Sequence, residues 1–127
     1  MKCFLSLITL TLITSCAAPK YLHRSIHDGV SVAYRWDHSR DKPSELLMRM
    51  ENVSTEDRRI SLVIDIYHQG RTVETLQADT CIKVGQAMSG KLNGIYFVPE
   101  SVTREQIESG DVQLELTRTF VEPLTCP

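Results

Sequence analysis

Apolar residues alternate with polar ones along much of this chain, and this period of two residues limits its fold more than any other feature. The clearest stretch is 60–67, where the apolar row is Ile60, Leu62, Ile64 and Ile66. In an extended strand, every second side chain lies on the same face. A strand with one apolar face must bury it against another layer, so the chain is expected to be mainly β structure.

Six further stretches show this alternation or a shorter apolar run, namely 30–36, 46–51, 71–76, 81–84, 91–98 and 111–121. Gln69-Gly70 predicts a tight hairpin after 60–67, because Gly readily adopts the positive φ that such turns need. In 111–121 the inward row is expected to be Val112, Leu114, Leu116 and Phe120. Short strands at intervals near ten residues predict an all-β fold, a single antiparallel β-sandwich of immunoglobulin-like type, with a small β-barrel as the alternative.

A short helix is predicted near 104–109. Thr103 and Gln106 have the spacing of a capping box, Val102 and Ile107 that of a hydrophobic staple, and Gly110 follows as a C-terminal cap.

Length and charge narrow the function classes. The chain has 127 residues, which fits one domain, and 14 basic against 16 acidic residues give a net charge of −2. Proteins that bind nucleic acids usually carry a basic surface, so no nucleic-acid partner is expected.

The N-terminus has the order of an export signal. Lys2 precedes an uncharged apolar stretch at 4–13, which is too short to cross a membrane as a helix. Ile13-Thr14-Ser15-Cys16 then resembles the lipobox of bacterial lipoproteins. The alternative is an ordinary signal peptide cleaved after residue 18, with Cys16 incidental.

The lipobox resemblance implies that residues 1–15 are removed and that Cys16 carries the acyl chains. Residues 16–28 would then be a lipidated tether, and residues 29–127 the sandwich domain. Ala17 stands where inner-membrane lipoproteins commonly have Asp, so the resemblance favours the outer membrane. Without an acidic or Ser-rich export segment after Cys16, the protein is expected to face the periplasm, with the cell surface as the alternative.

Two cysteines then remain as thiols, Cys81 and Cys126. Export to an oxidising compartment makes a disulfide between them the expected state. Two free buried thiols, or a bridge to another chain, are the alternatives.

Motifs for chemistry are few, so no enzyme activity, cofactor or metal site is expected. The glycines are spread through turns and form no phosphate-binding loop. Asp37-His38-Ser39 has the residue types of a catalytic triad, but neighbours in one turn do not converge as a triad must. Asn52-Val53-Ser54 matches a glycosylation sequon, and Asn52 is interpreted instead as the start of a turn.

Three aromatic residues are candidates for recognition. Tyr34 and Trp36 are expected on one face of their strand, and Tyr67 opposite the isoleucine row. Exposed, they could stack on a sugar ring or a partner; buried, Trp36 would be a core residue.

The stretch 47–98, with Tyr67-His68-Gln69-Gly70 as its hairpin, is similar to the uncharacterised YcfL-like envelope lipoproteins. This resemblance implies architecture rather than activity. The expected function is a lipid-anchored, non-enzymatic accessory subunit that binds a protein partner in a Gram-negative envelope. The alternative is a module that binds glycan or peptidoglycan.

Overall fold

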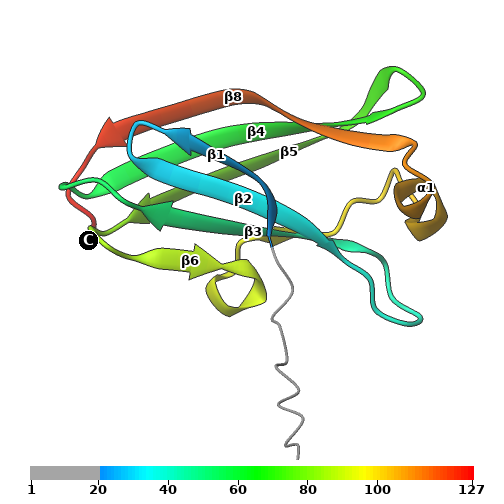
Figure 1. The fold of residues 1–127 in the computed structure, drawn as a ribbon, viewed down its shortest axis with the longest axis horizontal. Helices are drawn as coiled ribbons and strands as arrows, with labels where there is room; N and C mark the ends of the chain where they lie inside the picture. The colour runs from blue at the N-terminus through cyan, green and yellow to red at the C-terminus, as the bar shows by residue number, and fades with distance from the viewer. Residues whose placement is uncertain (1–20) are drawn as a thin grey trace, which may run out of the picture.

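The computed structural model describes residues 21–127, which form two antiparallel sheets packed face to face (Figure 1). The first sheet has the order β1 (Leu22–His27), β2 (Val30–Asp37), β3 (Glu45–Asn52) and β6 (Ala87–Ser89), and β7 (Tyr96–Phe97) also pairs with β3. The second has the order β5 (Arg71–Ile82), β4 (Arg58–His68) and β8 (Val112–Pro123). The predicted all-β sandwich is therefore confirmed, whereas its immunoglobulin-like type stays a prediction.

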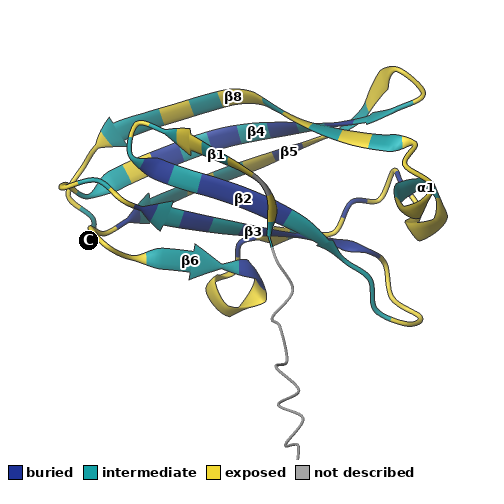
Figure 2. Ribbon diagram, viewed as in Figure 1, coloured by how far each residue is buried: buried dark blue, intermediate teal, exposed yellow. Residues whose placement is uncertain are grey.

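The core lies between the sheets and consists of the predicted alternating rows (Figure 2). On β4 the isoleucine row is at most 2% exposed. The opposite sheet contributes Val30, Val32, Leu46, Met48 and Met50, all with no exposed surface. Burial of these side chains supplies most of the favourable free energy of folding.

The β4–β5 hairpin turns at the predicted Gln69-Gly70, whose φ angles are 53° and 74°. Two positive φ values are the signature of a type I′ turn, which matches the twist of the strands. Its return strand runs without a break from Arg71 to Ile82, so the separate strands predicted at 71–76 and 81–84 are one strand.

A second hairpin turns at Asp28-Gly29, with φ angles of 43° and 82°. It joins β1 to β2, and β1 pairs along β2 from Val30 to Tyr34. Residues 16–28 are predicted to be a tether, but Leu22–His27 is a strand of the sandwich. The domain boundary predicted at residue 29 therefore lies too late in the chain.

The segment expected to be a strand at 91–98 is divided. Gly90–Asn93 forms the 3₁₀ helix η1, and only Tyr96–Phe97 is a strand. Asn93 accepts a hydrogen bond from the Ser89 amide at 2.7 Å, and Gly94 ends the turn at a φ of 71°. These local bonds compete with strand pairing.

The predicted helix is α1 (Arg104–Glu108), and its capping box is complete. The Thr103 hydroxyl accepts from the Gln106 amide at 3.2 Å, and the Gln106 side chain accepts from the Thr103 amide at 2.9 Å. α1 connects β7 to β8 at one end of the sandwich (Figure 1).

β8 carries a bulge, and the bulge corrects one core prediction. Val63 pairs with Arg118 and Ile64 with Leu116, so Thr117 is an extra residue. An extra residue reverses which side chains point inward. Phe120 consequently pairs with the outward-facing Ser61 and is 57% exposed, although the alternation predicted it in the core.

Candidate functional site

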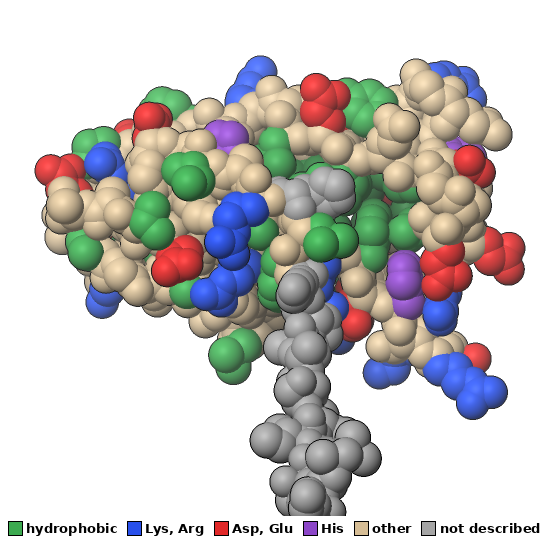
Figure 3. Space-filling view, in the orientation of Figure 1, with side chains coloured by type: hydrophobic (Ala, Val, Ile, Leu, Met, Phe, Trp, Pro, Cys, Tyr) green, Lys and Arg blue, Asp and Glu red, His purple; other side chains and the backbone are tan. Residues whose placement is uncertain are grey.

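A cavity of about 340 Å³ opens between the sheets and brings Tyr34 and Trp36 together. Leu22 and Leu114 complete its apolar lining, and Arg35 and Gln113 add polar groups. Figure 3 shows hydrophobic side chains gathered in a hollow between β2 and β8.

Strand pairing explains where this cavity lies. Among residues 21–127, β1 covers β2 only as far as the pair Leu22–Tyr34, and within this range no strand pairs with Arg35 to Asp37 on that side. β8 is the edge strand of the other sheet. The sandwich therefore has an open side where β2 and β8 approach each other.

The polar groups at the cavity include several hydrogen-bond donors. The Arg35 Nη1 lies 3.6 Å from Asp37 Oδ1, and its guanidinium carbon is 5.2 Å from the centre of the Tyr21 ring. Its Nε is buried and has no hydrogen-bond partner among residues 21–127. Burial raises the pKa of the Tyr34 hydroxyl, which stays protonated at neutral pH. Flat apolar rings beside N–H and O–H donors suit either an apolar protein side chain or a sugar.

Trp36 also stacks on His38, with ring centres 6.5 Å apart and planes within 9°. The His38 Nδ1 lies 2.7 Å from the hydroxyl of Ser44, not of Ser39, and Ser44 is only 7% exposed. This hydrogen bond ties together the loop between β2 and β3. Within Asp37-His38-Ser39, His38 therefore packs against Trp36 and is held in place by Ser44.

Tyr67 lies apart from the other two aromatics. It lines a second pocket, with a volume of about 450 Å³, at the β4–β5 turn, together with Gly70, Gly110 and Gln113. A hydrogen bond with Thr72 lowers the pKa of Tyr67, but desolvation and the carboxylates of Glu115 and Asp65 outweigh it, so the net shift is upward. Of the three predicted recognition residues, the cavity between the sheets therefore unites only Tyr34 and Trp36.

Four residues of this cavity are not predicted from the sequence: Leu22, Arg35, Gln113 and Leu114. Leu22 falls within the predicted tether 16–28, and Leu114 is predicted only as a core residue. The sequence signal that could have identified Leu22 is Asp28-Gly29, because an Asp-Gly dipeptide favours a tight hairpin turn. A hairpin there would have placed Leu22 near Tyr34.

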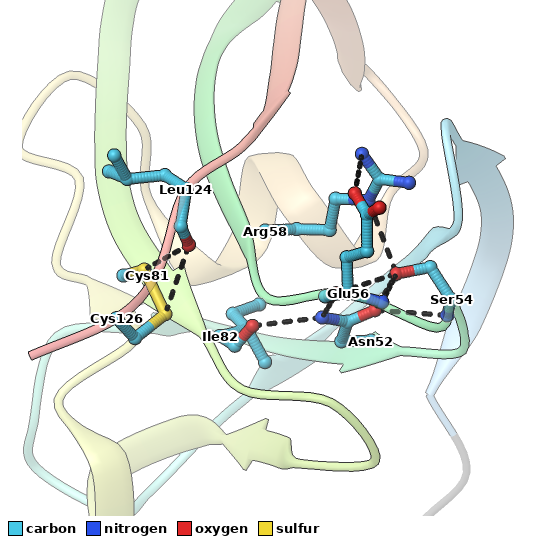
Figure 4. A network of polar contacts seen from close by, with 8 residues as sticks. All are labelled: Asn52, Ser54, Glu56, Arg58, Cys81, Ile82, Leu124 and Cys126. Carbon is cyan, nitrogen blue, oxygen red and sulfur yellow. Dashed lines mark hydrogen bonds and ion pairs between the residues drawn. A yellow bond between two sulfur atoms is a disulfide. The ribbon is translucent and has the colours of Figure 1, made fainter.

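The predicted pair Cys81 and Cys126 forms a disulfide, with Cα atoms 5.6 Å apart. Beside it, Asn52 is 1% exposed and joins three segments (Figure 4). Its Nδ2 donates to the carbonyls of Glu56 and Ile82 at 2.8 and 2.9 Å, and its Oδ1 accepts from the Ser54 amide at 2.9 Å. Buried in this way, Asn52 begins a turn as predicted.

The predicted lipidation site Cys16 and the predicted signal segment 1–15 lie outside the described residues. Within residues 21–127, no three His, Cys, Asp or Glu side chains are placed to hold a metal ion. In the same range no helix has the length and apolar character to cross a bilayer. No family model, curated protein or solved structure matches the chain.

Proposed function

We propose that this protein is a lipid-anchored, non-enzymatic accessory subunit of a Gram-negative cell-envelope assembly. It is held in the outer membrane, faces the periplasm and binds a protein partner. The observation that carries the proposal is the lipobox Ile13-Thr14-Ser15-Cys16 only a few residues before a single small sandwich. A short chain from lipid to domain keeps the domain close to the membrane.

The partner is proposed to bind at the open side of the sandwich. The cavity there offers Trp36 and Leu114 to an apolar side chain. The adjoining β8 is an edge strand, and an edge strand presents unpaired backbone groups to an incoming chain.

Membrane anchoring is tested with Cys16→Ser in the full chain. The variant should lose palmitate labelling and move from the membrane to the soluble fraction. Continued membrane association without label would contradict lipid anchoring.

Partner binding is tested by photocrosslinking in intact cells. A photoreactive amino acid at Gln113, which lines the cavity, should capture a distinct envelope protein. The matched control is the same amino acid at Arg118, which is exposed on the same strand but does not line that cavity. Equal capture at both positions, or none at Gln113, would argue against this surface.

The alternative function is binding of glycan or peptidoglycan, favoured by aromatic rings beside the donors of Arg35 and Gln113. Trp36 is the only tryptophan of the chain, so its fluorescence reports on this cavity alone. Muropeptide addition should then shift the emission and protect Trp36 from iodide. An unchanged emission at saturating muropeptide would contradict glycan binding at this cavity and favour the protein partner.

A further inference from the structure

Three neighbouring side chains on η1 and β7 form an amphipathic corner of the domain, which we call the η1 patch: Lys91, Leu92 and Tyr96. Leu92 is 91% exposed, the largest value for any exposed large hydrophobic side chain among residues 21–127. Tyr96 is 39% exposed, and the Lys91 Nζ lies 5.7 Å from the centre of its ring.

The η1 patch lies beside the point where the described chain begins. A Cβ added at Gly90 would be 3.2 Å from the Tyr21 hydroxyl oxygen, so Tyr21 packs directly against the start of η1. Gly90 also lies beside β3, because that same Cβ would be 3.8 Å from the Leu47 side chain. In Figure 1, the coil of η1 after β6 is close to the start of β1.

Covalent reach then limits how far this corner can be from the anchor. Five residue steps separate Cys16 from Tyr21, and a fully extended chain spans at most about 3.3–3.6 Å per residue, or about 18 Å in total. This step rests on the proposed lipid anchor at Cys16. If that anchor is in the bilayer, Tyr21 lies within about 18 Å of the acylated residue, so the surface around it can reach the headgroup layer.

The chemistry of the patch fits that location. A leucine with its side chain in water gains free energy by entering the acyl boundary, and tyrosine and lysine are suited to the headgroup layer. Lys91 is already paired with Glu45, with Nζ 2.7 Å from Oε1. The pair nearly cancels the local charge, so the contact should depend on the apolar side chain more than on anionic lipid.

We propose that the η1 patch is a second membrane contact, in which Leu92 inserts into the same phospholipid leaflet that holds the acyl chains of Cys16. An acyl anchor at one residue does not by itself set the orientation of the domain relative to the bilayer. Two contacts on one side of the domain would hold it in one orientation relative to the bilayer.

The test uses full-length acylated protein reconstituted into vesicles of phosphatidylethanolamine and phosphatidylglycerol. With Cys16 acylated and Cys81 bonded to Cys126, Leu92→Cys supplies one free thiol for a nitroxide label. Relaxation by oxygen, which concentrates in lipid, is compared with relaxation by a water-soluble nickel chelate. The matched control is Phe120→Cys, which is 57% exposed on the outward face of the other sheet.

The expected ratio of oxygen to nickel accessibility is at least about fivefold higher at position 92 than at position 120, as for a side chain within the acyl boundary. Equal ratios at the two positions, in protein that sediments with the vesicles, would overturn the membrane contact and leave the anchor intact. Failure to sediment would overturn the anchor, and with it both proposals.

Discussion

At the residue scale, Asn52 decides how the two sheets are connected at one end. It closes β3, and its amide reaches the carbonyl of Ile82 at the end of β5 and that of Glu56 before β4. A buried side chain that satisfies several backbone groups is costly to remove, because each freed group stays desolvated.

We therefore expect Asn52→Ala to lower the free energy of unfolding by about 2–4 kcal/mol. The measurement is urea denaturation followed by circular dichroism. The control is Asn93→Ala, which removes an exposed side chain bonded to one backbone amide and should cost less than about 1 kcal/mol. Equal losses in the two variants would contradict the role assigned to Asn52.

Asp57 is one of the residues that make the stability depend on pH. Its carboxylate accepts from the amides of Val84 and Cys126, both at 3.0 Å, and these bonds lower its pKa below the ordinary value. A lowered pKa in the folded state means that the carboxylate stabilises the fold above the ordinary Asp value of about 3.9. That contribution is lost as the pH falls through the lowered pKa.

We compare the urea denaturation midpoints of wild type and Asp57→Asn as a function of pH. The variant should have the lower urea midpoint at about pH 7, and the gap should shrink as the pH falls through the lowered pKa of Asp57. Other carboxylates titrate in both proteins, so the difference between the two midpoints isolates Asp57. A gap that does not change with pH would contradict this account.

At the element scale, the bulge in β8 separates residues that the sequence pattern grouped together. Before Thr117 the inward row is Leu114 and Leu116, and after it Val121 packs on the core while Phe120 faces outward. Alternation along one strand cannot reveal the bulge, because the extra residue is defined only by the pairing with β4.

The exposed position of Phe120 is tested against Ile64, which is fully buried on the neighbouring strand. Ile64→Ala should lower the free energy of unfolding by about 2–5 kcal/mol, because it leaves a cavity between the sheets. Phe120→Ala should change it by less than about 1 kcal/mol. Urea denaturation of both variants checks this, and a loss at Phe120 comparable to that at Ile64 would place the ring in the core.

At the scale of the whole molecule, the disulfide holds the C-terminal segment against the end of β5. It links residues 45 positions apart, and removing it releases a long loop in the unfolded chain. In the chain-entropy model, closing a loop of this length raises the free energy of unfolding by about 3–4 kcal/mol.

Replacing both cysteines, Cys81→Ser with Cys126→Ser, should therefore lower the free energy of unfolding by about 3–4 kcal/mol. The sheets bury their core without the bridge, so the far-ultraviolet circular dichroism of the folded state should not change. Wild type unfolded in reducing agent should match the double variant. Equal free energies with and without the bridge would contradict the prediction.

The residues that face the core in β2, β3 and β4 could be predicted from the sequence, as could the hairpin at Gln69-Gly70, the capped helix and the cysteine pair. Each depends on contacts between near neighbours, on one strand's own alternation or on a count of cysteines. Three features follow only from how the strands pair and pack: Leu22–His27 joins the sheet, Phe120 faces outward, and Tyr34 meets Trp36 and Leu114 at one cavity. These depend on pairing register and on which edges of two sheets meet, and no single segment carries that information.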